Sequence, residues 1–331
     1  MTATMVATAQ TSAESKDRML DPARAKEQVR HLEDCVAGVL RGKPEVIRLA
    51  TVCLLSRGHV LVEDVPGVGK TTLAQAFARS VGAAFQRIQF TSDLLPSDII
   101  GVSVFRQREE RFEFVPGPLF ANVVLADEIN RATPKTQSAL LEAMSEQRVS
   151  VDRKRYSLAR PFWVMATQNP LDYHGTFPLP ESQLDRFMMS LKVGYPPRRE
   201  ERDLLLSGGV ERLLDDLRPV LSKEELIALQ EQAAGVHVEE KLADYMLALA
   251  EATRTSGAFA LGVSTRGVQG LFRAVQALAL CEGRTFATPD DVQRLAVPVL
   301  SHRISLRRQL GGTEAQREAI QELVTTLPVP V

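Results

Sequence analysis

The sequence predicts a doubly wound α/β domain followed by a smaller helical domain. Three observations support this fold class. Short apolar runs alternate with helical patterns along the first two thirds of the chain, a glycine-rich loop joins the first run to a helix, and only helical periodicity follows residue 197. A chain of 331 residues is also too long for one small core.

The apolar runs are the expected strands of a buried parallel sheet. Each is almost continuously apolar, as expected of strands covered on both faces. They span residues 59–63, 84–90, 122–126 and 162–166. Helical patterns at 72–80 and 134–146 separate them, which favours strand–helix–strand units.

The segment before the first strand is predicted to be helical from Asp21 to about Ser56. Val29, Leu32 and Val36 recur at three- and four-residue steps, and a second helix follows Pro44. Residues 1–19 are expected to form a disordered tail. Their start is rich in Ala, Thr and Ser and lacks the basic segment and long apolar run of a signal peptide.

Two β-hairpins interrupt the α/β pattern. Alternating apolar residues flank charged turns at 106–111 and at 152–155. The second turn contains Arg153, Lys154 and Arg155, which gives it a basic character.

A change of character near residues 195–199 predicts a linker. Two prolines and a charge run occur there, so the α/β domain is assigned to 20–197 and the helical domain to 198–331. Thr288 before Pro289 is typical of a helix start. The expected helices are 223–233, 240–254, 266–282, 289–300 and 313–326.

The glycine-rich loop predicts a phosphate site. Its end, Gly69-Lys70-Thr71, matches the P-loop pattern, although Asp64 stands where the full pattern has glycine. Backbone N–H groups of such a loop and the N-terminus of the next helix bind phosphates. The expected ATP-binding residues are Asp64, Val65, Pro66, Gly67, Val68, Gly69, Lys70, Thr71 and Thr72, with the Thr71 hydroxyl also a ligand of Mg²⁺.

Polar side chains follow two of the predicted strands. Asp127 and Glu128 come after the run 122–126, and Asn169 follows the run 162–166. Ligands of open α/β sheets bind beyond such strand ends. We expect Asp127 to hold Mg²⁺ and Glu128 to polarise the water that attacks the γ-phosphate, whereas Asn169 is equally consistent with a turn before Pro170.

Composition also bears on nucleic-acid binding, membrane insertion and the cellular compartment. The net charge of −1 gives no global field for nucleic acid, and no apolar stretch approaches the roughly 20 residues of a membrane-spanning helix. Cys35, Cys53 and Cys281 are widely spaced, as expected of free thiols in a reducing compartment. We therefore expect a cytoplasmic protein without membrane insertion.

Several longer segments form further motifs: TSDLLPSDI (91–99), FVPGPLF (114–120), ADEINRA (126–132), ATQNP (166–170) and LDRF (184–187). Together they resemble the signature segments of the MoxR family of AAA+ ATPases. The resemblance runs from about Leu32 to Arg308 and implies an AAA+ P-loop fold with a C-terminal helical lid domain.

The resemblance also implies residue roles. Asn169 matches sensor 1, Arg186 the arginine finger offered to a neighbouring subunit, and Arg266 in GVSTR (262–266) matches sensor 2, acting in cis or in trans. Arg131 is a second candidate interface arginine. Such ATPases complete their sites in a homo-oligomeric ring, usually a hexamer.

The work driven by ATP is implied only by the family. MoxR proteins are chaperone-like remodellers of protein complexes, often with a partner that carries a von Willebrand factor A domain, and assist maturation or metal-cofactor insertion. Two alternatives stay open. The basic turn 153–155 permits a nucleic-acid-stimulated motor, although no aromatic residues interleave there for base stacking. An ATP-dependent scaffold with little turnover is the other, although Glu128 argues against it.

Overall fold

A computed structural model describes residues 21–169, 175–206, 209–307 and 312–330 of the chain. The predicted N-terminal tail, residues 1–19, lies outside these ranges. Across them, no helix is both long and apolar enough to cross a bilayer.

The centre of the molecule is a five-stranded parallel sheet with the strand order β2-β5-β8-β1-β9. Its strands are β1 (Val60–Glu63), β2 (Phe85–Gln89), β5 (Val123–Asp127), β8 (Trp163–Gln168) and β9 (Met189–Leu191). The first four confirm the predicted strands. The fifth was not predicted, because three residues are too short for a periodic signal.

Strands β1, β5, β8 and β9 are buried on both faces, which explains their apolar runs. The expected burial fails for β2, which lies at the edge of the sheet with Gln86, Arg87 and Gln89 exposed. Successive side chains of a strand point to opposite faces. Val60 and Val62 therefore join one core cluster and Leu61 the other. The helices packed on the first face include α2 (Pro22–Val39), α3 (Pro44–Leu55) and α4 (Lys70–Ser80), and those on the second include α5 (Pro96–Ile100) and α6 (Pro134–Glu146).

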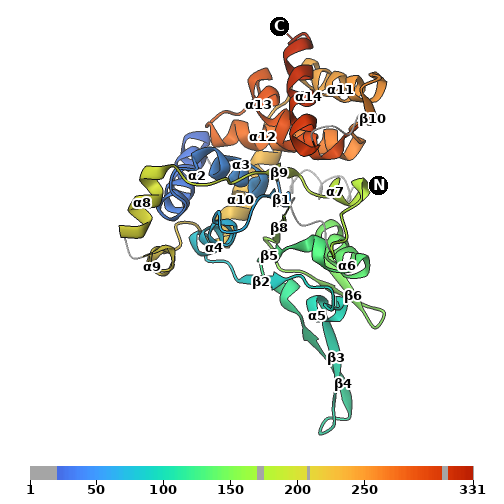
Figure 1. Cartoon of the computed structure of the whole chain (residues 1–331). Coiled ribbons are helices and arrows are strands. Elements are labelled where there is room, and N and C mark those ends of the chain that lie inside the picture. Colours follow the sequence, from blue (N-terminus) through green and yellow to red (C-terminus); the bar gives the residue numbers. More distant parts are fainter. Residues whose placement is uncertain (1–20, 170–174, 207–208, 308–311, 331) are drawn as a thin grey trace, which may run out of the picture.

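Two antiparallel hairpins extend the α/β core, as predicted. Strands β3 (Gly101–Arg106) and β4 (Arg111–Pro116) project from the body of the molecule (Figure 1). Strands β6 (Arg148–Val151) and β7 (Lys154–Ser157) form the second hairpin. Its turn contains only Asp152 and Arg153, with φ of 48° and 65°, so the expected four-residue turn is shorter than predicted.

The predicted C-terminal helices are found as α10 (Lys223–Ala234), α11 (Glu240–Thr255), α12 (Thr265–Cys281), α13 (Pro289–Leu300) and α14 (Gly312–Thr326). Helix α10 lies beside α3, whereas α11 to α14 gather at one end of the molecule (Figure 1). A short pair, β10 (Phe259–Leu261) and β11 (Ser305–Leu306), lies among them. Their core is continuous with the first face of the sheet.

The predicted linker at 195–199 leads directly into helices that the sequence did not reveal. Helix α8 (Arg198–Leu206) buries no residue, and α9 (Val210–Asp216) buries only Leu214, among the described residues. Helix α9 packs against α4 and α2. The boundary between residues 197 and 198 stays a prediction.

Candidate functional site

The glycine-rich loop connects β1 to α4, as its motif requires. Gly67 and Gly69 have φ of +84° and +97°, a region that side chains with a Cβ rarely adopt. A Cβ at Gly67 would meet no atom within 4 Å, so backbone conformation rather than space favours glycine there. Helix α4 begins directly after this loop, at Lys70, so its N-terminus faces the open space above the loop.

Asp64 has a structural part in this loop. Its Oδ1 accepts a hydrogen bond from the Val65 N–H at 2.8 Å, and its Oδ2 accepts one from the Gly194 N–H at 2.6 Å. The carboxylate therefore connects the loop to the chain after β9, which gives a reason for aspartate at a position where the full pattern has glycine. Val68 is buried in the core.

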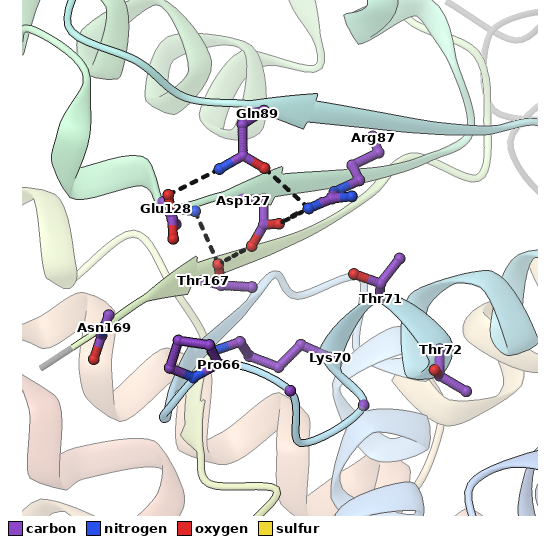
Figure 2. A pocket seen from close by; sticks show the side chains of 12 residues that line it. Pro66, Lys70, Thr71, Thr72, Arg87, Gln89, Asp127, Glu128, Thr167 and Asn169 are labelled. Carbon is purple, nitrogen blue, oxygen red and sulfur yellow. Dashed lines mark hydrogen bonds and ion pairs between the residues drawn. The ribbon is translucent and has the colours of Figure 1, made fainter. Parts of the chain in front are cut away.

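A cavity of about 360 Å³ lies over the loop and the ends of β2, β5 and β8. It brings together most of the expected site residues. Figure 2 shows the loop facing the strand ends across this cavity. The lining residues are Pro66, Gly67, Gly69, Lys70, Thr71, Thr72, Arg87, Gln89, Asp127, Glu128, Thr167 and Asn169. Asp64, Val65 and Val68 shape the loop without lining the cavity.

Lys70 is half-buried at the start of α4. Its Nζ donates to the backbone oxygens of Asp64 at 2.6 Å and of Val65 at 3.0 Å. Burial lowers the pKa of Lys70, while the carboxylates of Asp64, Asp127 and Glu128 act in the opposite direction. The ammonium is thus held at the loop by neutral acceptors, which a phosphate can replace.

Asp127 ends β5, and both of its carboxylate oxygens accept hydrogen bonds. Thr167 Oγ1 donates to Oδ1 at 2.6 Å, while Arg87 Nη2 and Nε donate to Oδ2 at 2.6 and 3.1 Å. The Thr71 hydroxyl lines the same cavity. Carboxylate and hydroxyl oxygens are suitable Mg²⁺ ligands, so these residues fit a metal that arrives with ATP.

Glu128 adopts a left-handed conformation with φ of 56°, which is uncommon for a residue with a side chain. Its N–H donates to Thr167 Oγ1 at 2.9 Å. Its Oε2 accepts from Gln89 Nε2 at 2.9 Å and pairs with Arg131 Nε at 3.1 Å. Arg131, expected at a subunit interface, thus contacts Glu128 of its own chain.

Sequence reasoning missed three residues of this site, Arg87, Gln89 and Thr167. Each lies on a strand of the parallel sheet and contacts Asp127 or Glu128. Arg87 and Gln89 are two residues apart on β2, so their side chains point to the same side of the sheet. Two polar residues two apart at the end of a predicted buried strand were the available signal.

Arg186 and Arg266 lie away from this cavity. They line a second cavity of about 290 Å³, formed between the ends of α3, α6 and α12. Arg186 Nη1 donates to Leu141 O at 2.8 Å and to Ser145 Oγ at 3.0 Å. No described carboxylate pairs with Arg266.

The second cavity contains more positive than negative charge. Arg303 Nε pairs with Asp185 Oδ1 at 2.9 Å, and Ser264 Oγ donates to the same carboxylate at 2.9 Å. Arg57 pairs with Glu231 at 3.8 Å, whereas no described carboxylate pairs with Arg186, Arg266 or Arg273. Its charged residues are Arg57, Asp185, Arg186, Arg266, Arg273 and Arg303.

Comparison with known proteins agrees with this architecture. Residues 59–189 match the model of the ATPase family associated with various cellular activities (AAA), and residues 251–324 match an AAA lid domain. A crystallised protein from Cytophaga hutchinsonii superimposes with a TM-score of 0.82 at 32% identity, covering 98% of this chain and 99% of its own.

Two relatives with assigned names align with most of this chain. Chaperone MoxR1 of Mycobacterium tuberculosis is 42% identical over 89% of this chain and 80% of its own length. Protein MoxR of Paracoccus denitrificans is 34% identical over 91% of this chain and 96% of its own length. With a parallel α/β core, a helical lid and these relatives, the chain belongs to the MoxR family of AAA+ ATPases.

Proposed function

We propose that this chain hydrolyses ATP with Mg²⁺ in the P-loop cavity and that a neighbouring copy completes each site. One observation carries the proposal. Lys70, Thr71 and the two acids at the end of β5 share one cavity, whereas Arg186 and Arg266 share another. A single chain therefore presents two halves of a phosphoryl-transfer site on different surfaces.

Within the P-loop cavity the residues divide the work of binding and proton transfer. The loop N–H groups and Lys70 bind phosphate oxygens, while Thr71 and Asp127 hold Mg²⁺. The metal supplies charge neutralisation of the phosphates. Glu128 orients the attacking water and takes its proton on a carboxylate oxygen, and Asn169 orients the same water from the end of β8.

The second cavity supplies the positive charge that this arrangement lacks. Arg186 and Arg266 line it together, and both act on the nucleotide of the adjacent subunit. A guanidinium placed there stabilises the charge of the transferred phosphoryl group. A head-to-tail interface of this kind forms a ring when its rotation closes, and we propose a closed ring of six copies.

The ring acts on protein clients. Val104, Phe105 and Phe112 are exposed on the β3–β4 hairpin. Acidic and basic residues are equal in number beside them, and Arg106 pairs with Glu113 at 2.6 Å, so the hairpin offers apolar contact rather than a positive field. That chemistry suits a polypeptide better than a polyanion. We propose chaperone-like remodelling or maturation of protein complexes, including metal-cofactor insertion, with a partner that carries a von Willebrand factor A domain.

The basic β6–β7 hairpin supports a nucleic-acid-stimulated motor as the second candidate. Lys154 and Arg155 are exposed near its tip. The ATPase rate with single-stranded DNA at two salt concentrations separates the candidates. Strong stimulation that falls as salt rises indicates phosphate contacts and contradicts the proposed protein client.

Glu128→Gln tests the enzymatic proposal. The amide keeps the shape of the side chain but takes no proton, so ATP binding and ring assembly persist while hydrolysis falls by about 100-fold or more. Binding is followed with a fluorescent ATP analogue, turnover by phosphate release and assembly by light scattering. A wild type that turns over no faster than Glu128→Gln contradicts the ATPase and indicates an ATP-dependent scaffold.

Glu128→Gln also serves to identify the client. A ring that binds ATP without hydrolysing it retains bound protein, so a pull-down in ATP recovers more client than a pull-down in ADP. The matched control is Lys70→Ala, which loses the phosphate contact and retains no client in either nucleotide.

A further inference from the structure

Arg87 lines the P-loop cavity and belongs to none of the sequence motifs described above. It lies on β2, opposite Leu125 in the register of β5. Its Nη2 and Nε donate to Asp127 Oδ2 at 2.6 and 3.1 Å, and Nη2 also donates to Gln89 Oε1 at 3.0 Å (Figure 2). Arg87 therefore occupies an oxygen of the carboxylate proposed to hold Mg²⁺.

Mg²⁺ and Arg87 compete for Asp127. The other oxygen of this carboxylate already accepts from Thr167, and the Asp127 side chain is only 12% exposed. A guanidinium and a divalent cation that bind the same carboxylate lie close together and repel each other strongly. A metal held by Asp127 would therefore displace Arg87 from the Oδ2 atom.

A released Arg87 remains inside the cavity. Strand β2 fixes its backbone, and its half-exposed side chain has room to move toward the loop. The cavity then holds the phosphates, whose oxygens match the guanidinium in charge and geometry.

We infer that Arg87 is a further phosphate-binding residue of this site: its guanidinium, paired with Asp127 in this structure, would contact the phosphates of ATP once the carboxylate holds Mg²⁺. The inference rests on the proposed function, because it requires ATP and Mg²⁺ in the P-loop cavity. It differs from a role in which Arg87 only neutralises Asp127. A neutralising residue matters most without the metal, whereas a phosphate-binding residue matters with it.

The test is the affinity of Arg87→Ala for a fluorescent ATP analogue, measured with excess Mg²⁺ and again with EDTA. With Mg²⁺ we expect the Kd to rise about tenfold, the effect of one hydrogen bond to a charged group. A rise below about twofold with Mg²⁺ overturns the inference, whether or not binding weakens in EDTA. Weakening in EDTA alone means that Arg87 only neutralises Asp127.

Two further variants keep this test decisive. Arg87→Gln retains a long polar side chain without charge and is expected to show the same rise, should Arg87→Ala unfold. Arg294→Ala is the matched control, because Arg294 also pairs with a carboxylate at 2.6 Å, Glu45, but far from the cavity. If the wild type does not bind the analogue, the proposed function fails. If the wild type binds it and the Arg87 variants bind it equally well, this inference alone fails.

Discussion

The two cavities of the chain differ most in their charge. In the P-loop cavity two cations face two carboxylates, and each carboxylate is held by hydrogen bonds (Figure 2). In the second cavity one carboxylate, Asp185, faces five arginines and is already paired with Arg303. The balanced charge of the first cavity suits the proposed metal and nucleotide, and the excess positive charge of the second suits an anion.

The second cavity also holds an arginine whose charged form is disfavoured by its surroundings. Burial is the main cause that lowers the pKa of Arg273, and the charge of Arg266 acts in the same direction. Charged groups that burial and like charges both disfavour gain most when an anion arrives. A phosphate chain bound in the P-loop of a neighbouring copy is such an anion.

The largest effect is expected from removing the arginine finger. Arg186→Ala leaves the P-loop cavity intact, so ATP still binds, but hydrolysis falls by about 10³-fold because the transition-state charge is no longer stabilised. Mixing this variant with Lys70→Ala restores part of the activity, measured as phosphate release. In the mixed ring an intact P-loop faces an intact Arg186.

That mixing experiment also has an outcome that breaks the comparison. If phosphate release stays at the level of the separate variants although light scattering shows mixed rings, then Arg186 does not act across a subunit boundary. The two cavities would then be unrelated sites.

Arg266 gives a smaller effect and a sharper geometric answer. Arg266→Ala is expected to lower hydrolysis by about tenfold, since Arg186 remains to carry most of the charge stabilisation. Mixing it with Arg186→Ala should restore nothing, because each interface then lacks one of the two arginines. Restored phosphate release in that mixture shows that Arg266 acts in cis and separates it from the surface of Arg186.

The P-loop half of the site was predictable because its signals are local. Lys70 and Thr71 belong to one short motif, and Asp127 and Asn169 each follow an apolar run whose burial the pattern already indicates. Parallel strands end at one edge of a sheet, so those residues were expected to meet there, and they do.

The remainder depends on contacts between distant segments. Arg87 belongs to the site only because β2 lies beside β5, a neighbour relation that spacing does not specify. The proximity of Arg186 to Arg266, 80 positions apart, depends on how α12 packs near α6. Strand β9 was missed for a simpler reason, since three residues show no period.

The smallest effect concerns the support beneath the second cavity. His59 lines it but is 5% exposed, and its Nδ1 accepts from the Val164 N–H at 3.0 Å. Its Nε2 therefore donates to Met144 O at 3.2 Å, and a second ring proton has no acceptor. Burial accordingly lowers the pKa of His59 to about 4, below its ordinary value of 6.5.

Because the folded pKa lies below the unfolded one, His59 stabilises the fold fully above about pH 6.5, and this stability falls as pH decreases toward 4. At pH 5.5 the loss is about 1 kcal/mol of the free energy of unfolding. Urea unfolding of wild type and His59→Gln at pH 7.5 and 5.5 measures it: the wild type should lose about 1 kcal/mol more than the variant. His302, also buried with a lowered pKa, is present in both proteins and cancels in this difference. An equal pH dependence means that His59 accepts its second proton within the fold, and the wall of the arginine cavity is then less rigid than its hydrogen bonds indicate.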